Sequence, residues 1–335
     1  MAKKSQIAIN WAAACGGCDV SLLDIEARIL ELAEIADIVY WPVAMDFKRE
    51  ELAALPDGSV DFGLFNGAVR TGEQLEDAEL LRAKCKLLVA YGSCACFGGI
   101  PGLANLSDRD GIFEVVYRET PSTENPDDIR PQGECAVGDH RLTLPEFHDT
   151  VKCLSQVVEV DVLLPGCPPP NERILDLLEV VASYVDGGEL PPSGTVIASD
   201  KALCDACPRR DSRAGGRMAA IVRPHEVEAD QERCFLDQGI LCMGLATRGG
   251  CGATCIQANM PCRGCFGPTP HMLDPGAEAL SAIGSIAGEA NENDVPAHQM
   301  KRAIRSLRDP VGTFYRFTLP VAFLNRAVAD EPREE

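Results

Sequence analysis

The chain has 335 residues, enough for two domains of ordinary size, and 46% of them are apolar. Its formal net charge of −20 argues against nucleic acids and anionic membrane surfaces as partners. No apolar stretch is long enough for a transmembrane helix, and the basic N-terminus lacks the apolar core of an export signal. We therefore predict a cytoplasmic protein without a membrane anchor.

Sixteen cysteines are the most informative feature of the composition. The reducing conditions of the cytoplasm keep thiols from forming stable disulfides. Metal binding is the better explanation for so many cysteines in such a chain.

Strand and helix patterns alternate over the first half of the chain. Short apolar or β-branched runs predict strands at 6–11, 37–43, 61–69, 86–91 and 157–164. Apolar periodicity predicts helices at 21–32, 73–83 and 171–186, with Ser21 and Asp24 as a capping box and Asn171 as an N-cap. This alternation is typical of an α/β fold with a doubly wound parallel sheet.

The rest of the chain is less regular. The pattern at 102–154 is irregular and polar and predicts a long insertion, whereas 202–270 is rich in Cys, Gly and Pro with little periodicity. Helices are expected at 275–289 and 297–308, before an acidic tail that we expect to be disordered. We therefore divide the chain into a sheet domain (1–190), a cysteine-rich segment (191–271) and a helical C-terminal extension (272–335).

Four cysteines follow predicted strands at the point where each strand ends. Cys15 and Cys18 follow the first strand, Cys94 the fourth and Cys167 the fifth. Because parallel strands end at one edge of a sheet, these thiols are expected to converge. An iron–sulfur cluster or a zinc ion would suit four thiols, and a redox disulfide would suit Cys15 and Cys18 alone. The alternative is that Cys94 and Cys167 are small buried core residues.

Eight further cysteines lie between positions 204 and 265, and eight divides into two four-thiolate sites. Zinc bound as in a zinc ribbon is one interpretation, but the Gly- and Pro-flanked loops favour iron–sulfur clusters. Of the remaining four, Cys85 is expected to be structural, Cys96 is a competitor of Cys94 as a ligand, and Cys135 and Cys153 have no predicted role. The five histidines show no ligand spacing.

The motifs CGGC, GSCA, PGCPP, CxxCPRR and PCRGC follow one another in this order. In this order they resemble the small, electron-transferring subunit of nickel–iron hydrogenases, over about residues 6–270. The resemblance implies a flavodoxin-like first domain and three iron–sulfur clusters. It assigns the ligands to a proximal set (Cys15, Cys18, Cys94, Cys167), a medial set (Cys251, Cys255, Cys262, Cys265) and a distal set (Cys204, Cys207, Cys234, Cys242).

The resemblance also implies a function. H₂ would be oxidised at a nickel–iron centre on a separate large subunit, so this chain carries no catalytic residue of its own. Electrons would pass from the proximal to the medial and distal clusters, and then to a further iron–sulfur or flavin subunit. Three [4Fe–4S] clusters are expected, although the medial cluster of many relatives is [3Fe–4S].

The sequence departs from the membrane-associated members of this family. Cys204 stands where they have a histidine, Cys255 offers a fourth medial ligand, and Ala14 replaces a glutamate found in some members. These departures resemble the cytoplasmic, F420-non-reducing hydrogenases that feed heterodisulfide reductase. F420-reducing and NAD(P)-linked hydrogenases are the alternatives within the family. A cluster-binding subunit of a complex I-like enzyme and a zinc-stabilised scaffold without redox function are the alternatives outside it.

Overall fold

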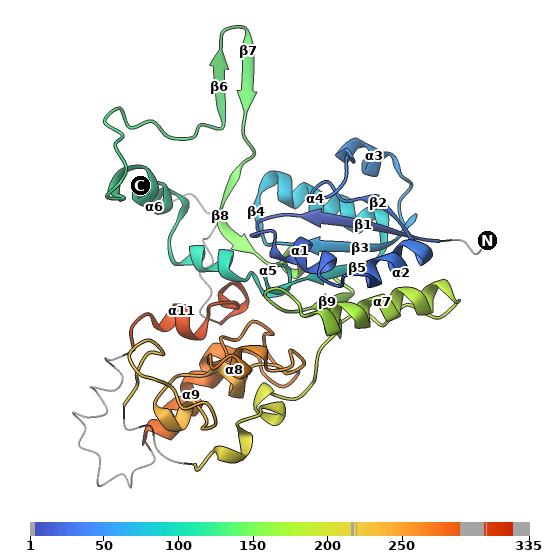
Figure 1. Cartoon of the computed structure of the whole chain (residues 1–335). Coiled ribbons are helices and arrows are strands. Elements are labelled where there is room, and N and C mark those ends of the chain that lie inside the picture. Colours follow the sequence, from blue (N-terminus) through green and yellow to red (C-terminus); the bar gives the residue numbers. More distant parts are fainter. Residues whose placement is uncertain (1–3, 216–217, 219, 289–304, 306, 324–335) are drawn as a thin grey trace.

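The computed structural model describes residues 4–215, 218, 220–288, 305 and 307–323. Its centre is a parallel sheet with the strand order β10-β9-β5-β3-β1-β2 (Figure 1). The strands are β1 (Ser5–Trp11), β2 (Ala36–Tyr40), β3 (Val60–Asn66), β5 (Cys85–Tyr91), β9 (Val162–Leu164) and β10 (Thr195–Val196). Counted along the chain, the first five strands of this sheet are β1, β2, β3, β5 and β9. Across the sheet they lie in the flavodoxin-like order 2-1-3-4-5, which confirms the predicted doubly wound α/β fold.

Helices cover both faces of this sheet (Figure 1). One face packs against α1 (Gly17–Leu23), α2 (Arg28–Ile35) and α7 (Asn171–Val185), and the other against α3 (Arg49–Ala54) and α4 (Gly72–Lys84). Successive residues of a strand point to opposite faces. Ile7 and Ile9 therefore join one apolar core, and Ala8 joins the other.

The predicted capping box at Ser21 is wrong. Helix α1 begins four residues earlier, with Gly16 as its N-cap at a φ of 83°. The Ser21 hydroxyl instead donates to the Cys18 carbonyl over 2.7 Å and shares a hydrogen bond of 2.8 Å with the Tyr91 hydroxyl. The helix predicted at 21–32 is two helices, α1 and α2, separated by a short turn.

Asn171 is not an N-cap either. Pro170 occupies the N-cap position of α7, and Asn171 is the first residue of the helix. Its side-chain amide donates over 2.8 Å to the carbonyl of Asp24, at the end of α1. Asn171 thus links the two helices rather than starting one.

Three predicted strands are shorter than expected, and the one predicted at 37–43 ends at Tyr40. The run 61–69 divides into β3 and β4 (Val69–Thr71) because the chain turns at Gly67, which has a φ of 98°. A Cβ at Gly67 would lie 2.7 Å from the Ala12 carbonyl carbon, so a larger residue does not fit there. Of the run 157–164, only its last three residues form a strand, β9.

The insertion after α5 (Ser93–Phe97) contains regular elements that the sequence did not reveal. They are α6 (Arg109–Glu114), β6 (Glu134–Val137), β7 (His140–Thr143) and β8 (Phe147–Lys152). Strand β8 pairs with β4, whereas β6 and β7 form a hairpin that projects from the molecule (Figure 1). Every residue of β6 and β7 is exposed.

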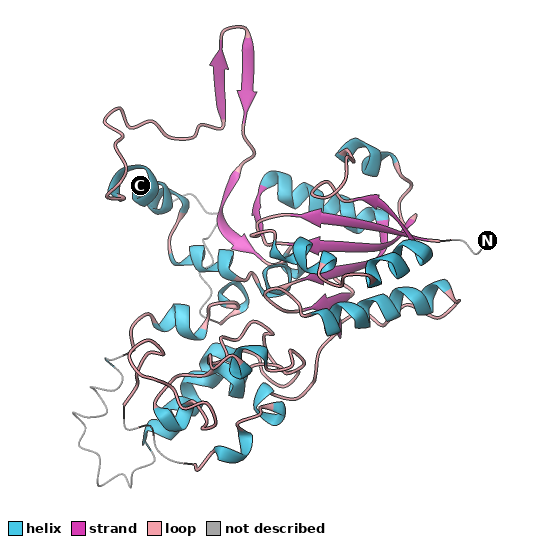
Figure 2. Ribbon diagram, viewed as in Figure 1, coloured by secondary structure: helices cyan, strands magenta, loops and turns pink. Residues whose placement is uncertain are grey.

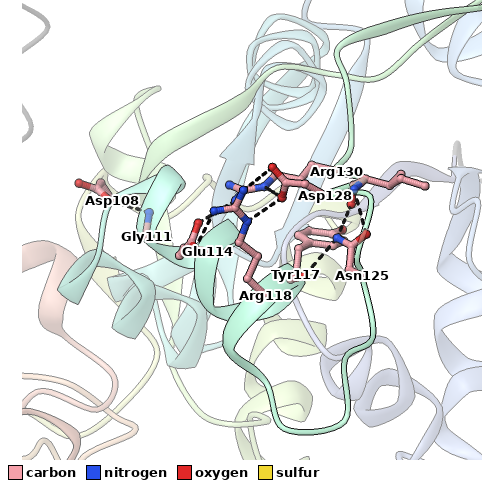
Figure 3. A network of polar contacts seen from close by, with 9 residues as sticks. Asp108, Gly111, Glu114, Tyr117, Arg118, Asn125, Asp128 and Arg130 are labelled. Atoms are coloured by element: carbon pink, nitrogen blue, oxygen red, sulfur yellow. Dashed lines mark hydrogen bonds and ion pairs between the residues drawn. The ribbon is translucent and has the colours of Figure 1, made fainter.

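A network of charged groups orders the loop between α6 and this hairpin (Figure 3). Arg118 and Arg130 both bond to the Asp128 carboxylate, and Arg130 also reaches Glu114 over 2.7 Å. Hydrogen bonds from these two guanidinium groups lower the pKa of Asp128 to about 2. The Asn125 side chain closes a turn by bonding both the N–H and the carbonyl of Ile129, each over 2.9 Å.

Beyond β10 the described residues form no strand (Figure 2). Short 3₁₀ turns and the small helix α8 (Thr254–Gln257) carry the cysteine-rich segment, as predicted. Helix α9 (Pro275–Gly288) confirms the helix predicted at 275–289, and α11 (Pro310–Phe314) is additional. The helix predicted at 297–308 lies almost wholly outside the described residues, and the acidic tail lies wholly outside them. Within the described part of the chain, no helix has the length and hydropathy needed to cross a membrane.

Candidate functional site

The proximal set comes from three loops that leave the carboxyl ends of β1, β5 and β9. Cys15 directly precedes α1 and Cys18 lies in its first turn, whereas Cys94 lies in α5 and Cys167 precedes α7. These strands belong to one parallel sheet, so their carboxyl ends share an edge. The structure therefore brings the four predicted residues to one place.

Mutual electrostatic effects show how close these thiols are. Burial raises the pKa of Cys18, and the neighbouring Cys94, Cys167 and Cys15 raise it further. Burial also raises the pKa of Cys94 to about 12, with an added contribution from Cys167. Four thiolates in this place would repel one another unless cations neutralised them. Bound iron would supply that positive charge, and it requires deprotonated thiols.

Two glycines make room for sulfur at this edge. Gly92 has a φ of 86°, and a Cβ there would clash with the Cys18 sulfur. Gly99 has a φ of 57°, and a Cβ there would clash with the Cys94 sulfur. Glycine at both positions lets the backbone approach the thiols closely, which is typical of iron–sulfur loops.

The distal set lies in turns rather than at strand ends. Cys204 lies in a 3₁₀ turn that Cys207 follows, and Cys234 and Cys242 each precede another. Burial raises the pKa of Cys204 to about 12, and Cys242, Cys207 and Cys234 all add to the effect. The backbone N–H of Arg209 donates to the Cys207 sulfur over 3.4 Å. The structure thus brings these four predicted residues together as well.

The medial set surrounds a cavity of about 330 Å³. All four of its thiols line this cavity, together with Cys167 of the proximal set and apolar side chains such as Phe266. Burial raises the pKa of Cys265 to about 12, with contributions from Cys251, Cys167 and Cys255. The cavity has four thiols around it, of which Cys262 is buried and Cys255 is exposed, and this ligand set fits a bound iron–sulfur group.

Contacts between the sets give them an order. Cys265 of the medial set is close enough to Cys167 of the proximal set for their charges to interact, and Cys262 is likewise close enough to interact with Cys242 of the distal set. The N–H of Cys262 donates to the Cys242 sulfur over 3.3 Å. The medial set therefore lies between the other two.

No group of three or more His, Cys, Asp or Glu side chains in the described part of the chain is arranged to hold a single metal ion. The cavity of the medial set is much larger than one ion. Cysteine thiolates are the usual ligands of iron–sulfur clusters, and four of them line this cavity.

The other four cysteines are placed differently. Cys96, the competitor of Cys94 in the sequence, donates its thiol to the Ala90 carbonyl over 3.2 Å and is buried. Cys85 is buried at the start of β5, as predicted for a structural residue, and Cys153 is buried beside Ser155. Cys135 is exposed on the hairpin.

Sequence reasoning missed Asp19, which follows Cys18 directly. This carboxylate is 3% exposed and accepts hydrogen bonds from the Trp41 indole over 2.9 Å and the Asn66 amide over 3.1 Å. Burial raises the pKa of Asp19 despite these two donors. The pair of bonds ties α1 to β3 and to the residue after β2, and so holds the Cys18 turn against the sheet edge. The sequence did contain a signal for this role, because Asp19 is the one charged residue in the stretch 17–23.

Comparisons with known proteins agree with this arrangement. Residues 15–181 match the family model described as "NADH ubiquinone oxidoreductase, 20 Kd subunit", a range that contains the whole proximal set. The chain is 40% identical over 316 residues to the iron-sulfur subunit of the F420-non-reducing hydrogenase of Archaeoglobus profundus, covering 93% of this chain and 95% of that protein. It is 36% identical to a subunit of the F420-non-reducing hydrogenase of Methanothermobacter marburgensis over 99% of both chains.

A solved structure supports the fold. The chain matches a chain of the Dm. baculatum [NiFeSe]-hydrogenase with a TM-score of 0.51 and 19% identity, over 81% of this chain and 96% of that one. At this identity the match speaks for the architecture alone. The two long, highly similar relatives carry the family assignment: this chain belongs to the family of small subunits of the F420-non-reducing hydrogenases.

Proposed function

We propose that this chain is the electron-transfer small subunit of a nickel–iron hydrogenase, carrying electrons from H₂ oxidation on a separate large subunit to a partner redox protein. The observation that supports it best is the order of the three cysteine sets, in which the medial set adjoins both others. Bound iron–sulfur clusters would supply one-electron chemistry at each set. A continuous series of such sites is what an electron-transfer subunit needs.

In this proposal each set binds one [4Fe–4S] cluster through its four thiols. The fourth medial thiol, Cys255, favours [4Fe–4S] over [3Fe–4S] at that position. We also propose the division into a sheet domain that carries the proximal set (1–190), a segment that carries the other two (191–271) and a C-terminal extension (272–335).

The chain's own residues would perform three tasks. Burial of Cys18, Cys242 and Cys262 limits the access of water to one side of each site, and solvent exposure affects the reduction potential of a cluster. Backbone N–H groups donate to sulfur, as from Arg209 to Cys207 and from Cys262 to Cys242, and such bonds stabilise thiolate charge. The bond from the Ser93 hydroxyl to the Cys265 carbonyl, 2.5 Å long, holds the medial loop against the loop that carries Cys94.

The large subunit would face the proximal set and the electron acceptor would face the distal set. An acceptor of the heterodisulfide reductase type is favoured because the relatives are named F420-non-reducing hydrogenases. The alternative is an acceptor linked to F420 or NAD(P). Assaying the purified complex with H₂ and each acceptor in turn separates them: we expect neither F420 nor NAD(P)⁺ to be reduced directly.

The ligand assignment is tested on the complex purified without oxygen, by iron and acid-labile sulfide content and EPR. Cys167→Ser should lose the iron of one cluster and H₂-dependent dye reduction. Cys255→Ser should lose medial iron or give a [3Fe–4S] signal. Cys135→Ser, which changes an exposed cysteine outside the three sets, should behave as wild type.

Several results would contradict this proposal. A colourless protein with zinc and no acid-labile sulfide would establish the scaffold alternative. Full iron content and activity in Cys167→Ser would remove that residue from the proximal set, and an unchanged EPR spectrum in Cys255→Ser would remove that residue from the medial set.

A further inference from the structure

A second cavity in the cysteine-rich region gathers positive charge. This cavity, which we call the arginine pocket, has a volume of about 250 Å³. Its lining includes the four arginines Arg223, Arg263, Arg308 and Arg316, together with His225. The whole chain has 31 Lys and Arg against 51 Asp and Glu, so four arginines around one cavity are a marked departure from the composition.

No carboxylate in the described part of the chain pairs with these arginines. No Asp or Glu lines the arginine pocket. None of the four guanidinium groups forms an ion pair within the described residues, although many other arginines of the chain do, such as Arg82 with Asp161 and Arg248 with Asp200. Glu226 accepts a bond of 2.8 Å from the backbone N–H of Arg223 and not from its side chain.

Arg209, in the same region, is an arginine whose side chain is fully engaged in contacts within the protein, and it serves as a comparison. Its guanidinium donates to three backbone carbonyls and to the Asn259 side chain, and it lies 4.1 Å over the Phe235 ring. In the arginine pocket, only Arg316 makes a side-chain bond of this kind to another described residue, from its Nε to the Gly312 carbonyl over 2.9 Å. The remaining donors of the four arginines are therefore available to a ligand.

The four guanidinium groups lie around one cavity. Arg263 also lines the cavity of the medial set, whereas Arg223, Arg308 and Arg316 do not. The apolar side chains of Ile221, Leu241 and Leu307 form part of the lining, and in such surroundings charges interact more strongly than in water. An anion in this space would be attracted by several guanidinium groups at once.

We propose that the arginine pocket binds a compact, multiply charged phosphate anion, either free or as the phosphate end of a small molecule. Planar guanidinium groups bind phosphate oxygens in pairs, which suits several arginines around one ligand. A single carboxylate carries one negative charge and would leave most of the cations uncompensated. The cavity is also smaller than the roughly 300–1,000 Å³ of sites for drug-sized ligands, which favours phosphate or diphosphate over a whole dinucleotide.

The experiment uses the full chain in its complex, purified without oxygen in phosphate-free chloride buffer at low ionic strength. Inorganic phosphate, pyrophosphate and ADP are titrated separately by calorimetry. We expect saturable binding at one site per chain, weakened by added salt. ADP that binds no more tightly than pyrophosphate would identify the inorganic ion as the ligand, and tighter binding would identify a nucleotide; both support the proposal.

Two substitutions sharpen the test. Arg223 and Arg308 are exposed and their side chains bond to no other described residue, so Arg223→Gln and Arg308→Gln should leave the fold intact. Each should weaken pyrophosphate binding by about tenfold, and the double variant by more, because each removes charge-assisted hydrogen bonds. Arg28→Gln, an exposed arginine whose partner is Glu31, is the matched control and should bind as wild type.

Absence of saturable binding to all three probes would overturn the proposal. Equal loss of binding in Arg28→Gln and in the pocket variants would do so too, because it would indicate general charge attraction. If no probe binds but Arg223→Gln and Arg308→Gln release a protein partner from the complex, the arginine pocket is a docking site for an acidic protein surface instead.

Discussion

The sheet and the cysteine-rich segment position their cysteines by different means. In the sheet, an apolar core of strand and helix side chains such as Phe62 and Leu164 sets the fold, and Cys18 is the one member of the proximal set that belongs to it. In the cysteine-rich segment, Cys242 and Cys262, from two different sets, both belong to the buried cluster. We therefore expect folding to depend less on bound iron in the first region than in the second.

Removing iron tests this contrast most strongly. We expect an anaerobic chelator to abolish protection from amide hydrogen exchange at 204–215 and 234–265, where turns replace regular ladders. The amides of β3 and β5 should keep their protection, because these strands pair along their length without help from a metal. Hydrogen-exchange mass spectrometry of the loaded and chelated protein measures both regions at once.

Equal loss of protection in the two regions would show that the sheet also depends on bound iron. Unchanged protection in both would show that the apolar part of the second core, which includes Phe235, Leu236 and Phe314, holds that region together alone.

Truncating a sheet core residue should have the next largest effect. Phe62 is fully buried in β3 and stacks edge-on against Tyr184, with ring centroids 5.5 Å apart. Phe62→Ala should lower the free energy of unfolding of the iron-free chain by about 3–5 kcal/mol, measured by urea denaturation. Leu30→Ala on α2, where the side chain is 66% exposed, is the control and should change it by less than about 0.5 kcal/mol. A small loss for Phe62→Ala would mean that the sheet too is loosely packed without iron.

The smallest expected effect is a change in the pH dependence of stability, caused by the buried Asp61 near the start of β3. Burial raises the pKa of Asp61, but bonds from Lys86 over 2.6 Å, the Gln6 N–H over 2.9 Å and the Ser5 hydroxyl over 3.1 Å lower it by more, so the net shift is downward. A carboxyl whose pKa is lower in the folded than in the unfolded state stabilises the folded state. This stabilisation is complete above the pKa of the unfolded chain, about 3.9, and is lost as the pH falls through the pKa of the folded state.

Asp61→Asn should therefore flatten the acid side of the stability curve of the iron-free chain, between about pH 5 and pH 2. Asp127→Asn, an exposed carboxylate of the insertion, is the control for general charge effects. An acid limb of the same slope in Asp61→Asn and in wild type would show that other carboxyls govern acid unfolding.

Much of the sheet could be predicted from the sequence. After the exposed Lys86, the run 87–91 is continuously apolar because this part of β5 is buried on both faces, and such a run is visible without a structure. Convergence of Cys15, Cys94 and Cys167 needed only the rule that parallel strands end at one edge. Local pattern and global fold agree in this part of the chain.

The failures have long-range causes. Ser21 fits a capping pattern, but Tyr91, far along the chain, takes part in bonding its hydroxyl. Gly67 interrupts a strand-like run because the backbone of Ala12 lies against it. The hairpin of β6 and β7 is exposed on every residue, so no alternation of buried and exposed positions marks it in the sequence. The arginine pocket joins four separated parts of the chain, at 221–225, 241, 263 and 307–316, which no local pattern reveals.

The bond from the Cys262 N–H to the Cys242 sulfur has a counterpart in the opposite direction. The N–H of Met243 donates over 3.0 Å to the Cys262 carbonyl, so the loops at 240–244 and 260–265 are joined by reciprocal bonds. An insertion or a backbone shift in one loop would displace a sulfur in the other. We therefore expect the lengths of the two loops to change together among homologues.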